Sequence, residues 1–435
     1  MTGSSRDQSS PQGSLQGSPQ WPLLQEAWAK QDVLLRSQPE SWWGTQAREL
    51  GARCLAHGLP TMKNEAWKYT SLVPLHEKGR TVGLGPVDVS APQGVLVFRL
   101  SELGERIQAG AVPEEARARI ESLLRPGDVD AVSFERTYFE KLSMSLVVDP
   151  FVVWIPEGLV SETPVEISWK SLPAQQWALG AAAIVVGANA NVAVLERYGN
   201  GVDAQSIATF IDVAPKASVS HLRVSGADGG DGGQVVLAST RAKVAAQARY
   251  ETAQVSYGSV LSREDLTVEL VEADASTVTD GVFIGRGRDV LDHHTNLVHR
   301  VGNTQSAQIY KGVLSDESRG VFNGRIAIAK HASGSNSSQM NRNLLLSKKV
   351  EIDTKPQLEI DNDDVKAAHG AAIGRLEADH VFYLRSRGIR LGQAVEILSR
   401  GFALEAVARL SSRVLRDLGA RAIEQGLRGL KWEAM

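Results

Sequence analysis

The sequence predicts a mainly β protein with helical regions on both sides of the β-rich part, and three observations support this. Between residues 151 and 376, short alternations of apolar and polar residues recur between Gly, Asn, Asp and Ser, which is the period-2 pattern of β-strands. Residues 21–150 show the spacing of helices, and the helical period returns over residues 377–435. Residues 1–20 are Ser, Gly, Gln and Pro with almost no large apolar residue, so we expect a disordered tail.

Composition narrows the possible functions. The chain has 435 residues, of which 43% are hydrophobic, and this favours a folded protein with a large core. The net charge is -3, so Lys and Arg are not in excess and do not favour nucleic-acid binding. No run in the sequence approaches the roughly 20 apolar residues that a membrane helix needs. We therefore expect neither nucleic acid nor a membrane as a partner.

The cysteine content bears on chemistry and location. Cys54 is the only cysteine of the sequence. A single thiol forms no internal disulfide and cannot alone hold zinc or an iron–sulfur cluster. The first residues also lack the apolar core of a signal peptide. Together these features predict a cytoplasmic protein.

The elements of residues 21–150 are mostly helical. Trp28, Leu35, Trp42 and Leu50 recur among polar residues at loose helical spacing. The stretch from Glu114 to Leu124 follows Pro113 and interleaves Arg with Glu, which predicts a helix. A short apolar run at residues 94–100 predicts a strand.

The strands of residues 151–376 admit two architectures. Clear alternation is shown by Leu266, Val268 and Leu270, which are separated by Thr267 and Glu269. Many short strands with turn residues between them fit a β-sandwich or barrel, and they equally fit a parallel β-solenoid. The absence of helices argues against a βαβ fold. No strict short repeat marks a regular solenoid, so the residues alone leave both architectures open.

The last region carries a long apolar stripe on helical spacing. Its second half consists of Leu404, Val407, Leu410, Val414 and Leu418. Such a stripe on a terminal helix usually packs on its own domain, and docking on a partner protein is the alternative.

Two clusters of residues are candidates for metal chemistry. His293, His294 and His299 are close in sequence, but adjacent residues of a strand face opposite sides, so packing or hydrogen bonding is favoured over metal binding. The second cluster is a short span with Asp361, Asp363, Asp364, Lys366 and His369. A neutral imidazole there could bind iron or relay a proton, with nearby carboxylates holding ferrous iron. A solvated turn capped by the histidine is the structural alternative, and the residue types alone favour it.

Several segments together resemble one known family. They are Lys355–Ile360, Asp363–Lys366, His369–Gly370 and Phe382–Ile389, with further matches at Asp292–Thr295, Gly320–Gly324, Asn343–Ser347, Gly58–Thr61 and Asn64–Thr70. In this order they resemble the SufD branch of the SufB/SufD family, which takes part in iron–sulfur cluster assembly. Each piece is weak alone, but their joint occurrence is specific and covers nearly everything after the tail.

The resemblance implies a fold and a set of partners. The implied fold is a right-handed parallel β-helix between an N-terminal helical region and a C-terminal helical domain. The implied role is a non-catalytic scaffold subunit of the SufBCD complex. It would pair with the SufB paralogue through the β-helices, or form a homodimer when isolated, and it would bind the SufC ATPase through the C-terminal domain. The stripe from Leu404 to Leu418 then becomes a candidate for ATPase docking.

The resemblance also implies a functional histidine, which maps onto His369, with Asp363, Asp364 and Lys366 as supporting candidates. We expect a nascent iron–sulfur cluster, or iron, to be held there transiently at the SufB interface, with no ligand set supplied by this chain alone. Ala367 stands where the family often has a cysteine, so the sulfur ligands should come from SufB. A flavin in the complex is a further possibility that the family suggests, although no flavin motif is visible in this sequence.

Two alternative functions stay open at this stage. A SufB-like scaffold that holds the cluster itself has the same fold, but the single cysteine disfavours it. A carbohydrate-active β-helix protein would carry paired carboxylates in a groove. No Walker A loop is present in the sequence, so ATP hydrolysis by that route is not expected of this chain.

Overall fold

The computed structural model describes residues 22–36, 41–78, 81–125, 133–170, 172, 176–198, 204–226 and 233–433. The expected tail at residues 1–20 lies outside these ranges. The N-terminal region has six α-helices in its described part: α1 (Pro22–Arg36), α2 (Trp42–His57), α3 (Val73–Lys78), α4 (Leu103–Gln108), α5 (Glu115–Leu124) and α6 (Tyr138–Leu146). It also contains β1 (Thr81–Leu84), β2 (Val87–Ser90) and β3 (Leu96–Arg99). The helix expected at residues 114–124 and the strand expected at 94–100 are thus confirmed as α5 and β3.

The middle of the chain consists of strands. One sheet is built from β4 (Phe151–Ile155), β6 (Gln176–Val186), β8 (Ala204–Val213), β10 (Gln234–Val244), β12 (Ser259–Leu270), β14 (Val290–His299), β16 (Arg319–Ile328) and β18 (Glu351–Ile360). The other contains β5 (Val165–Trp169), β7 (Asn191–Tyr198), β9 (Ser218–Gly226), β11 (Arg249–Tyr257), β13 (Ser276–Gly285), β15 (Gln305–Leu314), β17 (Ser335–Leu345) and β19 (Val365–Arg375).

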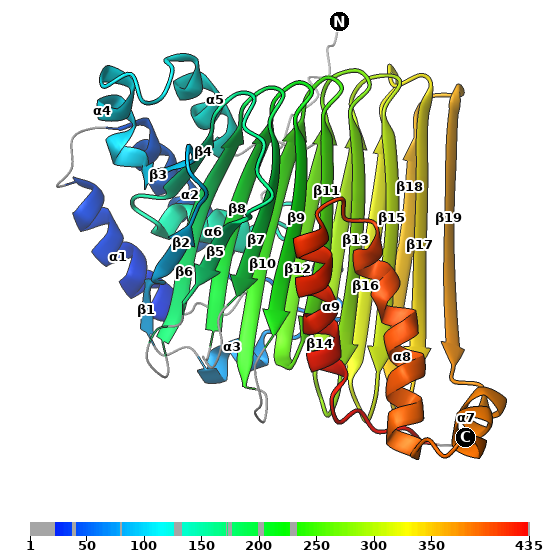
Figure 1. Ribbon diagram of the computed structural model, residues 1–435. Helices are drawn as coiled ribbons and strands as arrows, with labels where there is room; N and C mark the ends of the chain where they lie inside the picture. The colour runs from blue at the N-terminus through cyan, green and yellow to red at the C-terminus, as the bar shows by residue number, and fades with distance from the viewer. Residues whose placement is uncertain are drawn as a thin grey trace, which may run out of the picture.

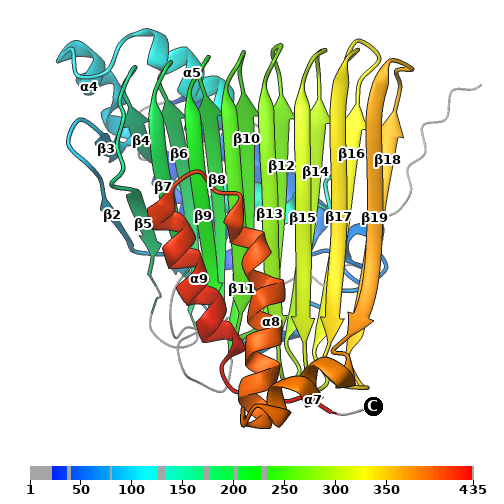
Figure 2. The ribbon, with the colours of Figure 1, turned by 45° about the vertical axis from the view of Figure 1, so that its right-hand side comes forward.

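The two sheets wind into a parallel β-helix. Even-numbered strands from β4 to β18 pair in parallel within one sheet, and odd-numbered strands from β5 to β19 do so within the other. Each coil therefore contributes one strand to each sheet, and the coils stack side by side from β4–β5 to β18–β19 (Figures 1 and 2). The predicted parallel β-helix is confirmed, and the sandwich or barrel alternative is excluded.

The first coils are closed by antiparallel strands. The N-terminal strand β2 pairs antiparallel with β5, and β3 pairs antiparallel with β4. A strand added in the opposite direction stops the parallel stacking and covers the edge that would otherwise be free. The coil formed by β18 and β19 ends both sheets on the other side, and no described strand covers it.

One turn in most coils places a residue in the left-handed region. The sharpest examples are Asn189, Lys216, Gln247, Asp274 and Asn303, with φ between 56° and 61°. This conformation is costly for residues other than glycine. It is offset here because the turns stack: Lys216 N donates to Ala246 O (2.9 Å), and Asn303 N donates to Ser333 O (2.8 Å) on the next coil. The turn is thus a structural repeat, although the residue that occupies it changes.

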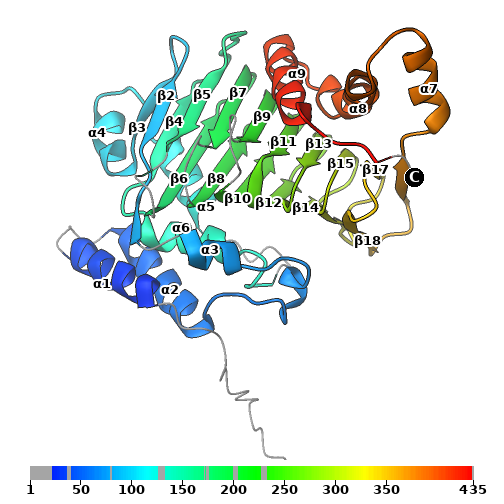
Figure 3. The ribbon, with the colours of Figure 1, turned by 90° about the horizontal axis from the view of Figure 1, so that it is seen from below.

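Helices cover both sheets from outside. Helices α3, α5 and α6 contact the even-numbered sheet, whereas α8 (Leu391–Ala408) and α9 (Arg413–Leu427) contact the odd-numbered sheet (Figure 3). A short helix, α7 (Ala378–Ser386), follows β19 and precedes α8. No helix in the described ranges is both long and apolar enough to cross a membrane.

The interior of the β-helix changes character along its axis. Around the first coils it is apolar, with Val165, Ile167 and Val194 fully buried. Further along, the same inward-facing rows carry His221, Arg223 and Gln308, which are also buried. Polar rows inside a β-helix require internal hydrogen-bond partners. Examples are Arg223 Nη1 donating to Thr240 Oγ1 (3.1 Å) and Gln308 Nε2 donating to Thr279 Oγ1 (3.0 Å).

Candidate functional site at the last coil

The last coil is the most exposed part of the β-helix. Strands β14 and β16 are almost wholly buried, whereas β18 is half-buried and β19 is mostly exposed. Each has a paired neighbour on one side only, β16 for β18 and β17 for β19. Their free edges therefore present backbone N–H and C=O groups that another strand could pair with.

His369 lies at an inward-facing position of this coil. On β19, Val365 and Ala367 pack against the interior core. Side chains alternate along a strand, so His369 faces the same way. Its register partner on β17 is Gln339, whose side chain is buried inside the β-helix. His369 nevertheless remains exposed, because no described coil follows to cover it.

The supporting candidates lie apart from His369. Asp363 and Asp364 are exposed in the turn before β19, where the Asp364 carbonyl accepts from Gly334 N at 2.7 Å. Asp364 and His369 are separated by roughly 16 Å along the chain at the rise of an extended strand. Lys366 is exposed on the opposite face of β19 from Val365 and Ala367. Neither carboxylate therefore reaches an ion bound to His369 within one chain.

The thiol of the chain is also far from this coil. Cys54 lies on α2 and is completely buried in a core between α2, α6 and the even-numbered sheet. Burial raises the pKa of the Cys54 thiol to about 12. A thiol in this state is protonated at neutral pH and does not act as a nucleophile or metal ligand.

The three clustered histidines have structural partners. His299 bonds Thr304 Oγ1 through Nδ1 (2.7 Å) and Ser306 Oγ through Nε2 (2.8 Å). His293 lies between the rings of Phe283 and Tyr310. Burial lowers the pKa of His293 to about 3 and that of His299 to about 4, so both rings are neutral. This is the packing and hydrogen-bonding role that the sequence favoured.

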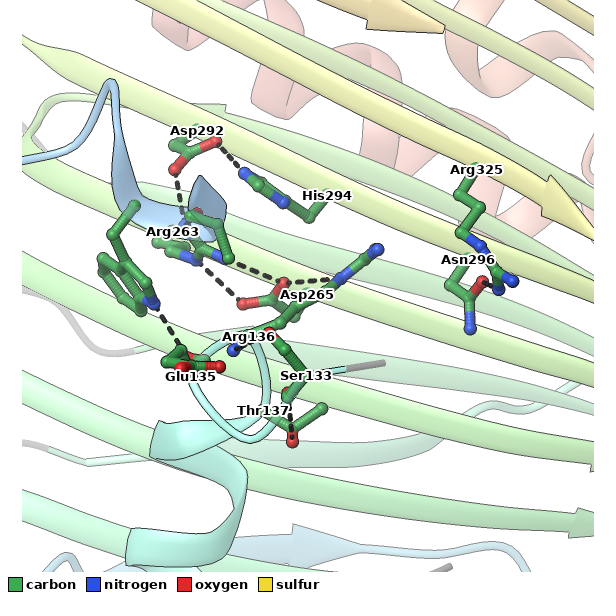
Figure 4. A network of polar contacts seen from close by, with 12 residues as sticks. Ser133, Glu135, Arg136, Thr137, Arg263, Asp265, Asp292, His294, Asn296 and Arg325 are labelled. Carbon is green, nitrogen blue, oxygen red and sulfur yellow. Dashed lines mark hydrogen bonds and ion pairs between the residues drawn. The ribbon is translucent and has the colours of Figure 1, made fainter. Parts of the chain in front are cut away.

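His294 faces outward from β14 and belongs to an ionic network covered by the N-terminal region (Figure 4). We call Arg136, Arg263, Asp265, Asp292 and His294 the covered network. The Arg263 guanidinium contacts Asp265 (2.9 Å) and Asp292 (3.1 Å), and Asp292 also contacts His294 Nε2 (2.8 Å). Although burial raises it, the pKa of Asp292 is held well below its usual range by the charges of His294 and Arg263.

The covered network fastens the N-terminal segment to the β-helix. Arg263 donates to the Ala66 carbonyl (2.6 Å) and stacks 3.8 Å from the centre of the Trp67 ring. Thr70 Oγ1 donates to Asp292 Oδ2 at 2.5 Å. Two of the sequence matches, Asn64–Thr70 and Asp292–Thr295, therefore meet in space. Each charged side chain of this network contacts another side chain of the network, which favours a structural role.

The apolar stripe of the C-terminal region is split. Leu404 and Val407 lie on α8, Leu410 lies in the turn after it, and Val414 and Leu418 lie on α9. The expectation of one continuous helical stripe is wrong, because Ser412 caps a new helix by accepting from Leu415 N. Val407 and Leu410 are buried against the odd-numbered sheet, Leu404 and Leu418 are half-buried there, and Val414 is 41% exposed. Two of the five docking candidates are thus covered by their own chain.

Sequence reasoning missed the apolar surface beside this stripe. Phe382 and Tyr383 of α7 are 72% and 56% exposed, and Ile397 of α8 is 49% exposed. Between the start of α8 and the end of α9 lies a cavity of about 370 Å³, lined in part by Val395, Ser399 and Leu430. The exposed pair Phe382–Tyr383 belongs to a matched segment, and this was the available signal.

The fold defines the class of protein: a parallel β-helix with helical regions on both sheets and an uncovered last coil. Residues 172–402 match the family model described as "SUF system FeS cluster assembly, SufBD core domain". The chain therefore belongs to the SufB/SufD family of iron–sulfur cluster assembly proteins. This membership selects the assembly protein over the carbohydrate-active alternative.

Individual relatives agree with the family match. The chain is 32% identical over 303 residues to an iron–sulfur cluster assembly SufBD family protein of Synechocystis, covering 66% of each chain. It is 37% identical over 172 residues to SufD of Escherichia coli, covering 40% of this chain and 41% of that protein. It is 27% identical over 289 residues to SufD of Bacillus subtilis, covering 65% of each. The matches thus span less than two thirds of these relatives' own lengths.

Proposed function

We propose that this chain is the scaffold subunit of a SUF assembly complex and contributes His369 to iron acquisition and nascent cluster assembly. In this proposal it pairs through its last coil with a cysteine-bearing SufB paralogue and docks a SufC ATPase on its C-terminal helices. The observation that carries the proposal is an exposed imidazole on an uncovered β-helix coil, in a chain whose single thiol is buried in α2.

The last coil supports pairing with another β-helix. Its two strands have free edges, and Ile360 and Ile373 expose 41% and 52% of their surface there. An exposed edge that bears apolar side chains favours strand addition by a partner. When the paralogue is absent, the same edge of a second copy could take its place, which is consistent with the expected homodimer.

The chemistry of the site requires a partner. A neutral imidazole supplies one nitrogen ligand for iron. Among the described residues, no group of three or more His, Cys, Asp or Glu is arranged to hold a metal ion. The remaining ligands, including thiolates for sulfur, would come from the paralogue. Iron and the nascent cluster are in this view cargo at the interface between the two chains.

The direct test is His369→Ala in the complete complex, purified after co-expression with the paralogue and the ATPase. We expect the complex to assemble and cluster formation to be lost, measured by the visible absorbance of the cluster and by iron and sulfide content. The matched control is His331→Ala, because His331 is also exposed but lies in the turn after β16. Normal cluster formation by the His369 variant would refute the proposal.

The docking surface for the ATPase is proposed to be the exposed apolar part of α7 and α8 rather than the buried part of the stripe. Phe382, Tyr383 and Ile397 provide apolar area, and the adjacent cavity lined by Ser399 could accept a side chain. The Ser399 hydroxyl is buried with no hydrogen-bond partner in the described part of the chain. A docking partner could satisfy it.

This docking proposal is tested with Phe382→Asp. A charge at a buried contact is costly to desolvate, so we expect ATPase binding to weaken roughly tenfold or more, measured by calorimetry. Val160→Asp is the control, because Val160 is 69% exposed but lies between β4 and β5. Equal affinities for the two variants would place the ATPase elsewhere.

A further inference from the structure

A row of polar side chains runs inside the last coils and ends at His369. Thr279, Gln308, Gln339 and His369 occupy successive register positions on β13, β15, β17 and β19. The first three are buried. Parallel neighbours in a sheet are about 4.8 Å apart, so each side chain lies within reach of the next. We call this row the glutamine ladder.

The hydrogen bonds of the glutamine ladder have one direction. Gln308 Nε2 donates to Thr279 Oγ1 (3.0 Å), and Gln339 Nε2 donates to Gln308 Oε1 (2.6 Å). Thr295 Oγ1, from the opposite sheet, also donates to Gln308 Oε1 (3.2 Å). Each amide therefore gives its N–H to the preceding coil. Consequently, the carbonyl oxygen of Gln339 is free to accept a hydrogen bond from a residue of the last coil.

This last carbonyl has no partner in the described ranges. Gln339 Oε1 is buried and accepts no hydrogen bond there. A buried acceptor without a donor is unfavourable, so a nearby N–H is expected to satisfy it. His369 is the next residue in the ladder, and no described residue hydrogen-bonds its ring.

A glycine on the opposite sheet leaves room for the amide of Gln339. Gly324 lies on β16 opposite the ladder, and a Cβ atom there would stand 2.0 Å from Gln339 Nε2. The missing side chain of Gly324 is therefore what gives the amide its room. An amide that is buried and enclosed in this way offers its carbonyl at a fixed position.

We propose that Gln339 is a positioning residue for His369. The exposed ring turns onto the ladder, and one ring N–H donates to Gln339 Oε1. This bond keeps that nitrogen protonated, so the other nitrogen carries the lone pair and faces the open end of the coil. Partners of this kind orient metal-binding histidines and set their tautomer. That the free nitrogen binds iron rests on the proposed function. The hydrogen bond between His369 and Gln339 does not rest on it.

The test measures the tautomer of His369 in the isolated full-length chain. Proteins labelled with ¹⁵N-histidine are compared by NMR, and the His369→Ala spectrum assigns the signals. We expect one dominant tautomer in the parent chain and a return to the ratio of free imidazole in Gln339→Leu. Asn336→Leu is the control, because Asn336 is on the same strand but exposed.

The outcomes separate the two proposals. A tautomer ratio that is the same in Gln339→Leu and in Asn336→Leu would overturn the positioning role. In the complete complex, we expect Gln339→Leu to slow cluster formation roughly 10-fold or more while leaving complex formation intact, as for other residues that orient a metal ligand. If one tautomer dominates but His369→Ala still forms clusters normally, the positioning role of Gln339 is supported and the proposed function of His369 is refuted.

Discussion

The covered network and the last coil place similar side chains in opposite situations. Around β12 and β14, the outward-facing His294 and Asp292 are enclosed by the N-terminal segment, and each contact is made within the chain. On β19, His369 occupies an equally regular position, but no described element covers it. The comparison shows that the elements around a histidine decide its role. A histidine covered by its own chain is structural, whereas an uncovered one is open to a partner protein.

The largest expected effect is on the covered network. Arg263→Met removes the charge that faces Asp265 and Asp292 and leaves two buried or half-buried carboxylates without their common partner. Breaking a buried ion pair from one side typically costs about 3–5 kcal/mol. We expect a loss of this size in the free energy of unfolding, measured in urea. The exposed control Asp363→Ala should change it by less than about 0.5 kcal/mol. A small loss for Arg263→Met would show that the network is not what fastens the N-terminal segment.

A substitution at Glu264, the interior-facing residue next to Arg263, is expected to raise the free energy of unfolding, by less than Arg263→Met lowers it. Burial raises the pKa of the Glu264 carboxyl from 4.5 to about 7. Between these values the folded state binds more protons than the unfolded chain, so Glu264 lowers stability as the pH rises from about 4.5 to 7. Glu264→Gln should therefore stabilise the protein at pH 8 by on the order of 1–3 kcal/mol, and much less at pH 4.5.

The measurement for Glu264 is a series of urea unfolding curves from pH 4.5 to 8, with Asp363→Asn as the exposed control. The difference between the Gln variant and the parent chain should grow with pH over this window. A difference that is independent of pH would mean that the Glu264 carboxyl does not titrate there, and the interior would then differ less from the last coil than we infer.

The smallest effect on stability is expected at His369 itself. Because the ring is exposed and its one proposed bond within the chain is to Gln339 Oε1, His369→Ala should lower the free energy of unfolding of the isolated chain by only about 0.5–1.5 kcal/mol. The same substitution should abolish cluster formation in the complex, as proposed above. A loss of several kcal/mol would place His369 with the structural histidines and erase the contrast between the two regions.

The sequence predicted the fold class because alternation along a strand is a local property. Leu266, Val268 and Leu270 are indeed buried on one side of β12. The choice between a sandwich and a β-helix was not local, since it depends on which strands pair. The repeat that could have decided it lies in the left-handed turns, where Asn189, Lys216 and Gln247 share a backbone conformation but not one residue type.

The candidate site was predicted only in part. The family motif located His369, but its inward direction follows from pairing with β17, which the sequence does not give. Gln339 was missed because one glutamine in a polar strand is ordinary in sequence. The covered network was missed for a similar reason: Arg263 and Asp292 resemble surface charges, and what buries them comes from the distant Asn64–Thr70 segment.

The bond between Thr70 and Asp292 joins residues that are 222 positions apart. A chain that emerges from the ribosome at about 5–20 residues per second makes its N-terminal segment roughly 10–45 seconds before the strand that receives it. During that interval Thr70 lacks the Asp292 side chain that helps to fasten the N-terminal segment to the β-helix. Newly made chains should therefore depend most on chaperones before β14 appears, and truncation before this strand should yield aggregated rather than partly folded protein.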